Sequence, residues 1–197
     1  MSLKERILGI DPGLNHTGFG VIDVEGSSMR FVTAGCIHVP RGELYERLST
    51  IYQELRKVIE ETKPTLAAAE IIFLNINPKS TLLLGQARGA AITCAATMGL
   101  TVKEFSATAI KSAIVGTGRA TKTQIQAMVS SLLGLQGDIQ SDAADALACA
   151  ITCAHATRIK DIKQSTLRNA PTGKRTLHSK TSKRHAWESL VKERTGK

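Results

Sequence analysis

The chain of 197 residues is long enough for one well-packed domain and a tail, but too short for two full domains. It contains no run of about 18 apolar residues, so no membrane-spanning helix is expected. Residues 158–197 carry 12 Lys and Arg against 3 Asp and Glu, whereas residues 1–157 carry 14 of each, so the whole net charge of +9 lies in the tail. A basic tail on a neutral body favours a polyanion partner, most commonly nucleic acid; an inert, solvated extension is the alternative.

Short apolar runs bounded by turn residues predict strands, and apolar residues in steps of three and four predict helices. The expected elements, in chain order, are strands at 6–10, 17–24 and 31–39, a helix from 44 to Pro64, a strand at 65–73, a helix at 78–98, a strand at 101–105, and helices at 106–114, 121–134 and 141–158. The first three strands are joined by short turns, which predicts an antiparallel meander. The whole order predicts an α/β protein with a mixed sheet.

Periodicity fades after Arg158. Pro171, Gly173 and many Lys, Ser and Thr residues make 164–184 a poor candidate for packing, and we expect this stretch to be poorly ordered. The sequence therefore divides into a folded domain at 5–158 and a basic tail at 159–197 that is disordered or weakly ordered.

The cellular compartment is indicated by the N-terminus and the cysteines. The first apolar run is short and is interrupted by Asp11, unlike a signal peptide. The four cysteines form no CxxC pair, and no histidine lies near them at the spacing of a zinc site. Reduced, buried thiols and a cytoplasmic protein are the expectation.

Four carboxylates have apolar neighbours, which is unusual for ionised groups. Asp11 ends an apolar run, Glu70 lies inside one, and Asp142 and Asp145 are surrounded by small residues. A turn residue, a buried ion pair or a helix N-terminal charge would explain each acid singly. The body has no excess of positive charge to pair with all four, so a bound cation is the simplest common partner.

Spacing supports a shared site for these acids. Asp142 and Asp145 are three residues apart on a predicted helix and share one face. Asp11 and Glu70 follow strands whose ends can converge in one sheet. Such oxygen ligands suit Mg²⁺ or Mn²⁺ rather than zinc. Two such ions can stabilise the entering and leaving oxygens of a phosphoryl displacement.

Several segments closely resemble the RuvC family of Holliday junction resolvases, in order and at matching separations, over about residues 5–157. These segments are Leu8–Gly13 with Thr17–Gly20, Gly85–Gly89, and Asp142–Leu147. The resemblance implies a ribonuclease H-like nuclease domain, with a mixed five-stranded sheet and helices on both faces. It also implies that Asp11, Glu70, Asp142 and Asp145 are the catalytic, metal-binding acids.

The resemblance further implies a crossover junction endodeoxyribonuclease that acts in homologous recombination and DNA repair. Such an enzyme resolves four-way DNA junctions by paired metal-dependent nicks, which leave 5′-phosphate and 3′-hydroxyl ends. It uses Mg²⁺, with two ions per site and Mn²⁺ as a substitute, works as a homodimer, and has the RuvA–RuvB branch-migration complex as a partner. The Gly85–Gly89 segment, with small residues on a helix, suits close packing and a dimer face.

DNA contacts are expected at four residues. Lys111 and Lys122 match basic residues that the family places near the scissile phosphate, and Arg119 lies in a flexible, basic connection. Phe73 falls where the family has an aromatic that stacks on junction bases; packing in the core is the alternative, and we favour stacking. One departure is Ile71, where many relatives have Gln, which leaves local junction contacts open.

Two other functions fit parts of the pattern. Actin-like ATPases and sugar kinases also begin with a strand, an Asp and a Gly-rich turn, but they need a second such domain. A non-catalytic junction-binding protein would be expected to lack one of the acids, and all four are present. Metal-dependent cleavage of a synthetic four-way junction separates the three.

Overall fold

The computed structural model describes residues 4–71, 77–137 and 139–169. The strands are β1 (Lys4–Asp11), β2 (His16–Glu25), β3 (Ser28–His38), β4 (Leu66–Glu70) and β5 (Thr101–Phe105). The helices are α1 (Leu44–Thr62), α2 (Pro78–Thr97), α3 (Ala107–Val115), α4 (Lys122–Leu133) and α5 (Ser141–Asn169). This order confirms the one predicted from the sequence. Within the described ranges, no helix is both long and apolar enough to cross a membrane.

The strands form one mixed sheet in the order β3-β2-β1-β4-β5. β1, β2 and β3 pair in antiparallel fashion, whereas β4 runs parallel to β1 and β5 parallel to β4. As a result, β1, β3 and β4 end where β2 begins. We call this end of the sheet the Asp11 edge.

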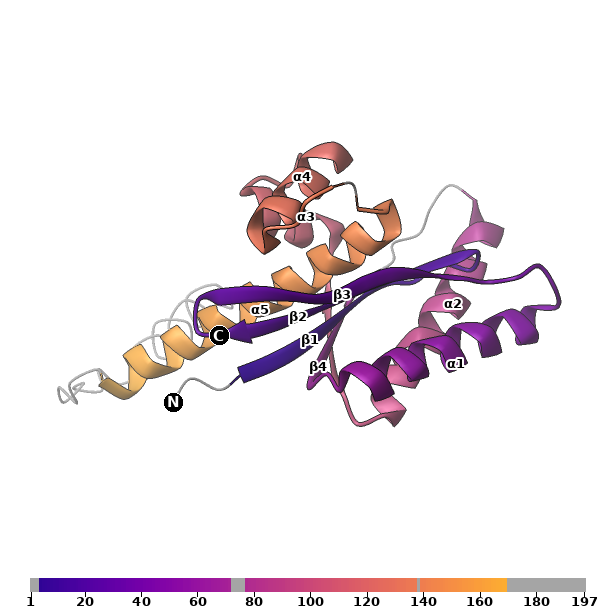
Figure 1. Ribbon diagram of the computed structural model, residues 1–197, viewed down its shortest axis with the longest axis horizontal. Coiled ribbons are helices and arrows are strands. Elements are labelled where there is room, and N and C mark those ends of the chain that lie inside the picture. Colours follow the sequence, from indigo (N-terminus) through magenta and orange to yellow (C-terminus); the bar gives the residue numbers. More distant parts are fainter. Residues whose placement is uncertain (1–3, 72–76, 138, 170–197) are drawn as a thin grey trace, which may run out of the picture. The chain divides into compact units, whose positions relative to one another are not determined.

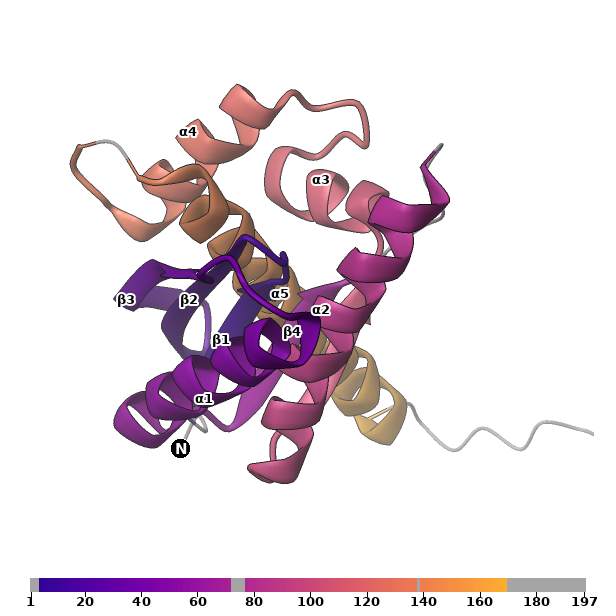
Figure 2. The same cartoon turned by 90° about the vertical axis from the view of Figure 1, so that its right-hand side faces the viewer.

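Helices cover both faces of the sheet (Figures 1 and 2). Alternate residues of a strand point to opposite faces, so β1 contributes to two cores. Leu8 and Ile10 pack in a core with residues of α1 and α2. Ile7 packs in the other, with residues of α3, α4 and α5. Gly9 and Asp11 therefore face α5, on the same side as Ile7.

Glycines let α5 pack directly on the sheet. A Cβ atom on Gly9 would lie 1.8 Å from the carbonyl oxygen of Ala146, and one on Gly18 would lie 2.0 Å from that of Asp142. Neither atom can move without moving the helix backbone. Gly20 is the next residue of β2 on the same face as Gly18, and a Cβ there would lie 2.6 Å from the side chain of Leu147. The strand glycines thus set the distance between the sheet and α5.

Two boundaries differ from the sequence prediction. β4 ends at Glu70, earlier than the expected strand to Phe73. α5 continues to Asn169, beyond the expected helix end at residue 158. The stretch from Arg158 to Asn169 has no Gly or Pro, and its Lys, Arg, Gln and Leu residues are good helix formers. Residues 170–184 lie outside the described part of the chain. The first compact unit ends at Ile162.

We predict that Gly9→Ala destabilises the domain by about 1–3 kcal/mol or more, because the added methyl group must push α5 away from β1. Urea unfolding followed by circular dichroism measures the change. The matched control is Gly42→Ala, whose Cβ would meet only the flexible carboxylate of Glu46. This control should stay within about 0.5 kcal/mol of the parent. Equal unfolding midpoints for Gly9→Ala and the parent would contradict the close contact.

Candidate active site

Two acids end neighbouring parallel strands. Asp11 is the last residue of β1 and Glu70 the last of β4. The register pairs Ile10 with Ala69, which places the two acids side by side at the Asp11 edge. Ala68 packs in the same core as α5, so strand alternation turns Glu70 toward that face as well.

Two further acids come from the start of α5. Asp142 lies in the first turn and Asp145 one turn later. Carboxylate oxygens of Asp11, Asp142 and Asp145 all lie within 4.8 Å of one another. Glu70 joins Asp11 and Asp145 in the lining of one cleft of about 300 Å³. The structure thus brings together the acids that the sequence singled out.

The charge of this cluster is poorly compensated. The pKa of Asp11 is raised from 3.8 to about 7. Burial is the largest cause, and three negative neighbours add to it: Asp145, Glu70 and Asp142. Lys122 acts in the opposite direction and lowers the pKa of Asp11, but it is the smallest of these causes. Burial and Asp145 also raise the pKa of Glu70, whereas Lys111 lowers it.

Two lysines line the cleft. Lys122 Nζ lies 2.8 Å from Asp145 Oδ2, an ion pair that raises the pKa of the lysine. Lys122 opens α4, where Thr121 caps the helix by accepting a hydrogen bond from the Gln124 backbone. Lys111 lies on α3 and lines the same cleft. Both ammonium groups can therefore reach a phosphate bound over the acids.

The other two expected DNA contacts are Arg119 and Phe73. Arg119 is exposed in the connection between α3 and α4 and is not part of the cleft lining. Phe73 lies outside the described residues, so its role as a stacking or core residue stays a prediction. Ile71 is half-buried, and its backbone N–H donates to the carbonyl of Phe105.

The donor set fits a hard divalent cation. Every donor in the cluster is a carboxylate oxygen, the ligand type that Mg²⁺ and Mn²⁺ prefer. Burial, followed by the charges of the neighbouring carboxylates, raises the pKa of Asp11, so the ionised form is disfavoured without a cation. A metal ion between the carboxylates would offset their charges. The residues present therefore suit one or two such ions.

Arg88 supports the site and was missed by the sequence analysis. Its Nε donates to the backbone carbonyl of Glu70 at 2.9 Å, and its guanidinium also pairs with Glu104 on β5. This holds the end of β4 against β5 and positions Glu70. Arg88 lies inside the Gly85–Gly89 segment, so the motif itself was the available signal.

Cys36 was also missed. Its thiol donates to Asp142 Oδ2 at 3.6 Å. Burial, then the nearby charge of Asp142, raises the pKa of this thiol to about 11.

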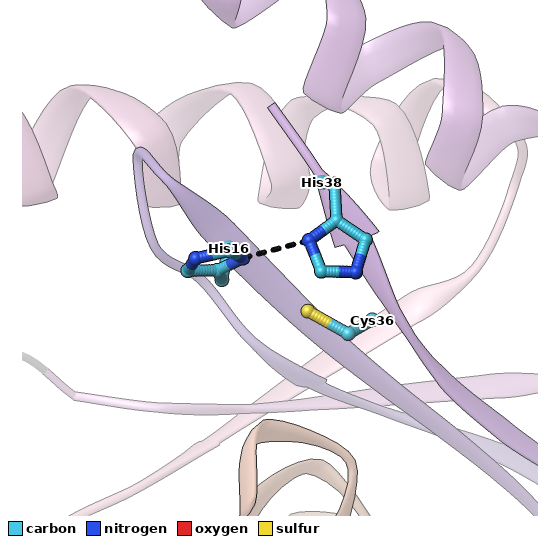
Figure 3. A group of neighbouring side chains, drawn as sticks. All are labelled: His16, Cys36 and His38. Carbon is cyan, nitrogen blue, oxygen red and sulfur yellow. Dashed lines mark hydrogen bonds between the residues drawn. The ribbon is translucent and has the colours of Figure 1, made fainter. Parts of the chain in front are cut away.

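One group of possible metal ligands was not indicated by spacing along the sequence. The ligand atoms of His16, Cys36 and His38 lie within 4.8 Å of one another (Figure 3). Sequence spacing concealed this cluster because pairing of β2 with β3 brings its members together.

Comparisons with known proteins identify the family. The family model described as "Crossover junction endodeoxyribonuclease RuvC" matches residues 7–153. Proteins of that name from Bordetella parapertussis and Bordetella avium are 57% and 58% identical to the chain. These matches cover 79% and 76% of this chain, and 86% and 83% of the relatives.

Solved structures give the same result. A Thermus thermophilus RuvC in complex with a Holliday junction substrate matches with a TM-score of 0.75 and 31% identity. The match covers 79% of this chain and 96% of that one. The yeast mitochondrial Holliday junction resolvase, at 12% identity and a TM-score of 0.64, shares the fold. The mixed five-stranded sheet is ribonuclease H-like, as expected, and the chain belongs to the RuvC family of crossover junction endodeoxyribonucleases.

Proposed function

We propose that the protein is a structure-selective endonuclease that resolves four-way DNA junctions in homologous recombination and DNA repair. It makes paired metal-dependent nicks that leave 5′-phosphate and 3′-hydroxyl ends. The observation that carries this proposal is the cluster of Asp11, Asp142 and Asp145. Asp11 and Asp145 also line a cleft together with Glu70 and two lysines. Family membership and the junction-bound Thermus thermophilus relative support the choice of substrate.

Asp11, Glu70, Asp142 and Asp145 would hold Mg²⁺, two ions per site, with Mn²⁺ as a substitute. When bound, these ions supply a Lewis acid that lowers the pKa of water and neutralises charge on the phosphate. β1, β4 and α5 carry the four acids, so these elements would position the bound ions at the Asp11 edge.

Lys111 and Lys122 would bind the oxygens of the scissile phosphate. Lys122 is paired with Asp145 and Lys111 lies near Glu70, so each ammonium group is already positioned at the cleft. Arg119 is exposed on the neighbouring connection, where it would contact the DNA backbone farther from the cut. Phe73 would stack on bases of the opened junction.

A homodimer would present two such sites to the junction. One face of α2 supports this: Leu82 is 65% exposed, and Cβ atoms added to Gly85 or Gly89 would meet nothing within 4 Å. Thr93 continues the same exposed face one turn after Gly89. A second copy could pack its α2 closely against this face, and a two-fold axis would relate the two clefts.

The wider setting is also proposed. All four cysteines are free, as in reducing compartments, which supports a cytoplasmic location. The RuvA–RuvB branch-migration complex is the proposed partner, on the basis of the family. We further propose that residues 5–158 form the nuclease domain and that the basic tail from 159 adds affinity for DNA that does not depend on sequence.

Asp11→Asn should lower Mg²⁺-dependent cleavage of a synthetic four-way junction by at least about 100-fold, because it removes a metal-binding charge. Junction binding in Ca²⁺ should remain measurable by gel shift. The variant should also be more stable than the parent above pH 7 in EDTA. The raised pKa of Asp11 means that the parent loses stability as pH rises from about 4 to about 7, and Asn has no proton to lose.

The matched control is Asp23→Asn, an acid on β2 that is 2.7 Å from Arg6 and outside the cleft. This control should cleave like the parent. It should be less stable than the parent, because it loses the ion pair with Arg6, whereas Asp11→Asn should be more stable. Cleavage at the parent's rate by Asp11→Asn in Mg²⁺ would refute the proposed mechanism.

Phe73→Ala tests the stacking role. Loss of stacking on a base should weaken junction cleavage by about 1–3 kcal/mol, roughly 5- to 150-fold, with little change in stability. A core role would instead cost about 3–5 kcal/mol of stability. Thermal unfolding and single-turnover cleavage of the same preparation separate the two. Stability loss with cleavage intact at low temperature would show that Phe73 packs in the core.

Deletion of residues 170–197 tests the tail and keeps all of α5. The deleted segment carries 8 Lys and Arg against 2 Glu. Binding to the junction should weaken, and the slope of log K against log salt should become shallower by about 0.9 for each phosphate that the protein no longer neutralises. The control is the full-length chain with these Lys and Arg changed to Gln, which should behave like the deletion. An unchanged salt slope would favour an inert tail.

A further inference from the structure

Three soft metal ligands share one corner of the Asp11 edge, outside the acidic cluster. His16 is the first residue of β2 and His38 the last of β3, and the two are direct partners in the strand register. Cys36 precedes His38 by two residues, so both side chains lie on the same face of β3. Cys36 is paired with Gly18, which faces α5, and this places all three side chains on the α5 side of the sheet.

The side chains already point toward one another. Nδ1 of His16 lies 3.0 Å from Nδ1 of His38, and the ring planes are perpendicular (Figure 3). Two nitrogens on one tetrahedral zinc lie about 3.3 Å apart, from Zn–N bonds of about 2.0–2.1 Å. The imidazoles therefore need to separate by only a few tenths of an ångström to hold a metal. Both side chains are exposed, and Cys36 is half-buried, so an ion can enter from solvent.

Asp142 of the acidic cluster contacts Cys36 and would supply the fourth donor once its side chain turns toward the histidines. Cys36 Sγ lies 3.6 Å from Asp142 Oδ2. Sulfur and oxygen on one tetrahedral zinc lie about 3.6 Å apart, from bonds of about 2.3 and 2.1 Å. In the metal-free protein this contact is a thiol hydrogen bond, and metal binding would release the thiol proton to solvent as the Zn–S bond forms.

The chemistry of the donors selects the metal. Two imidazoles and a thiolate suit a borderline-soft ion such as Zn²⁺, whereas Mg²⁺ requires oxygen ligands and dehydrates reluctantly. The two groups of donors therefore discriminate between metals although they share Asp142. A carboxylate of Asp142 that turns toward Cys36 to bind zinc would move away from Asp11 and Asp145, so Asp142 would no longer bind a metal in the acidic cluster.

We propose that His16, Cys36 and His38 form a zinc-binding site, completed by Asp142, and that zinc bound there inhibits the nuclease by withdrawing Asp142 from the acidic cluster. The inhibitory part rests on the proposed function; the site itself does not.

Metal binding is tested first, without DNA and without Mg²⁺, on the full-length protein, because Mg²⁺ at the acids would compete for Asp142. Co²⁺ is the probe, because Co²⁺ bound to a thiolate gives a charge-transfer band in the near ultraviolet. We expect one Co²⁺ per chain with this band, displaced by Zn²⁺. The band should be absent in Cys36→Ser, and affinity should fall at least about tenfold in His16→Ala and His38→Ala. Absence of the band in the parent, or its persistence in Cys36→Ser, would overturn the site.

His155→Ala is the matched control, a histidine on α5 outside the cluster, and it should bind Co²⁺ like the parent. Because His16 and His38 are exposed, their alanine variants should unfold at the parent's temperature, which thermal unfolding checks. Equal loss of affinity in His155→Ala and the two cluster variants would show that the effect is not specific to this site.

Inhibition is tested by titrating Zn²⁺ into junction cleavage at constant Mg²⁺. The parent should be inhibited at a Zn²⁺ concentration at least about tenfold lower than His16→Ala or His38→Ala. Equal inhibition of all three would mean that zinc acts elsewhere and would overturn the coupling to Asp142. No cleavage by the parent in Mg²⁺ alone would instead refute the nuclease function, while the Co²⁺ result would still decide the site.

Discussion

The close approach of α5 to β1 and β2 is the contact on which the acidic cluster depends. Strand glycines and helix alanines remove the side chains that would otherwise separate a sheet from a helix. The backbone of α5 therefore lies almost against the strands, and its first turns reach over the end of β1. Carboxylates as short as those of Asp142 and Asp145 can then approach Asp11. A larger residue at Gly9 or Gly18 would lift the helix and enlarge the site.

The cluster is electrostatically unfavourable without a metal, and the fold compensates for this only in part. Lys122 pairs with Asp145, and the start of α5 favours the negative charge of Asp142 through its free backbone N–H groups. Burial and the neighbouring carboxylates still raise the pKa of Asp11 to about 7, so its ionised form remains disfavoured. Packing of the two apolar cores holds the acids in place against the repulsion between their charges. Such local conflicts are expected at functional sites, where geometry is held for a ligand.

Asp142 connects two groups of donors with different chemistry. Its carboxylate is within 4.8 Å of other acid oxygens and also accepts a hydrogen bond from the thiol of Cys36. The hard and soft donors meet because one end of the sheet holds the last residues of β1 and β3 and the first of β2. Sheet topology, rather than any local motif, creates this neighbourhood.

The sequence by itself determined the elements and the mixed sheet and singled out the four acids as candidates, because hydrophobic periodicity and carboxylates in apolar settings are local signals. The distances between these side chains depend on residues far apart in the chain, and only the tertiary structure decided them. It showed that α5 continues to Asn169, that Arg88 holds Glu70, and that His16 and His38 meet across paired strands. Strand register brings together residues whose spacing in the sequence follows no rule. The distance between a helix and a sheet depends on the side chains of both. Neither the register nor this distance can therefore be predicted from one segment of sequence.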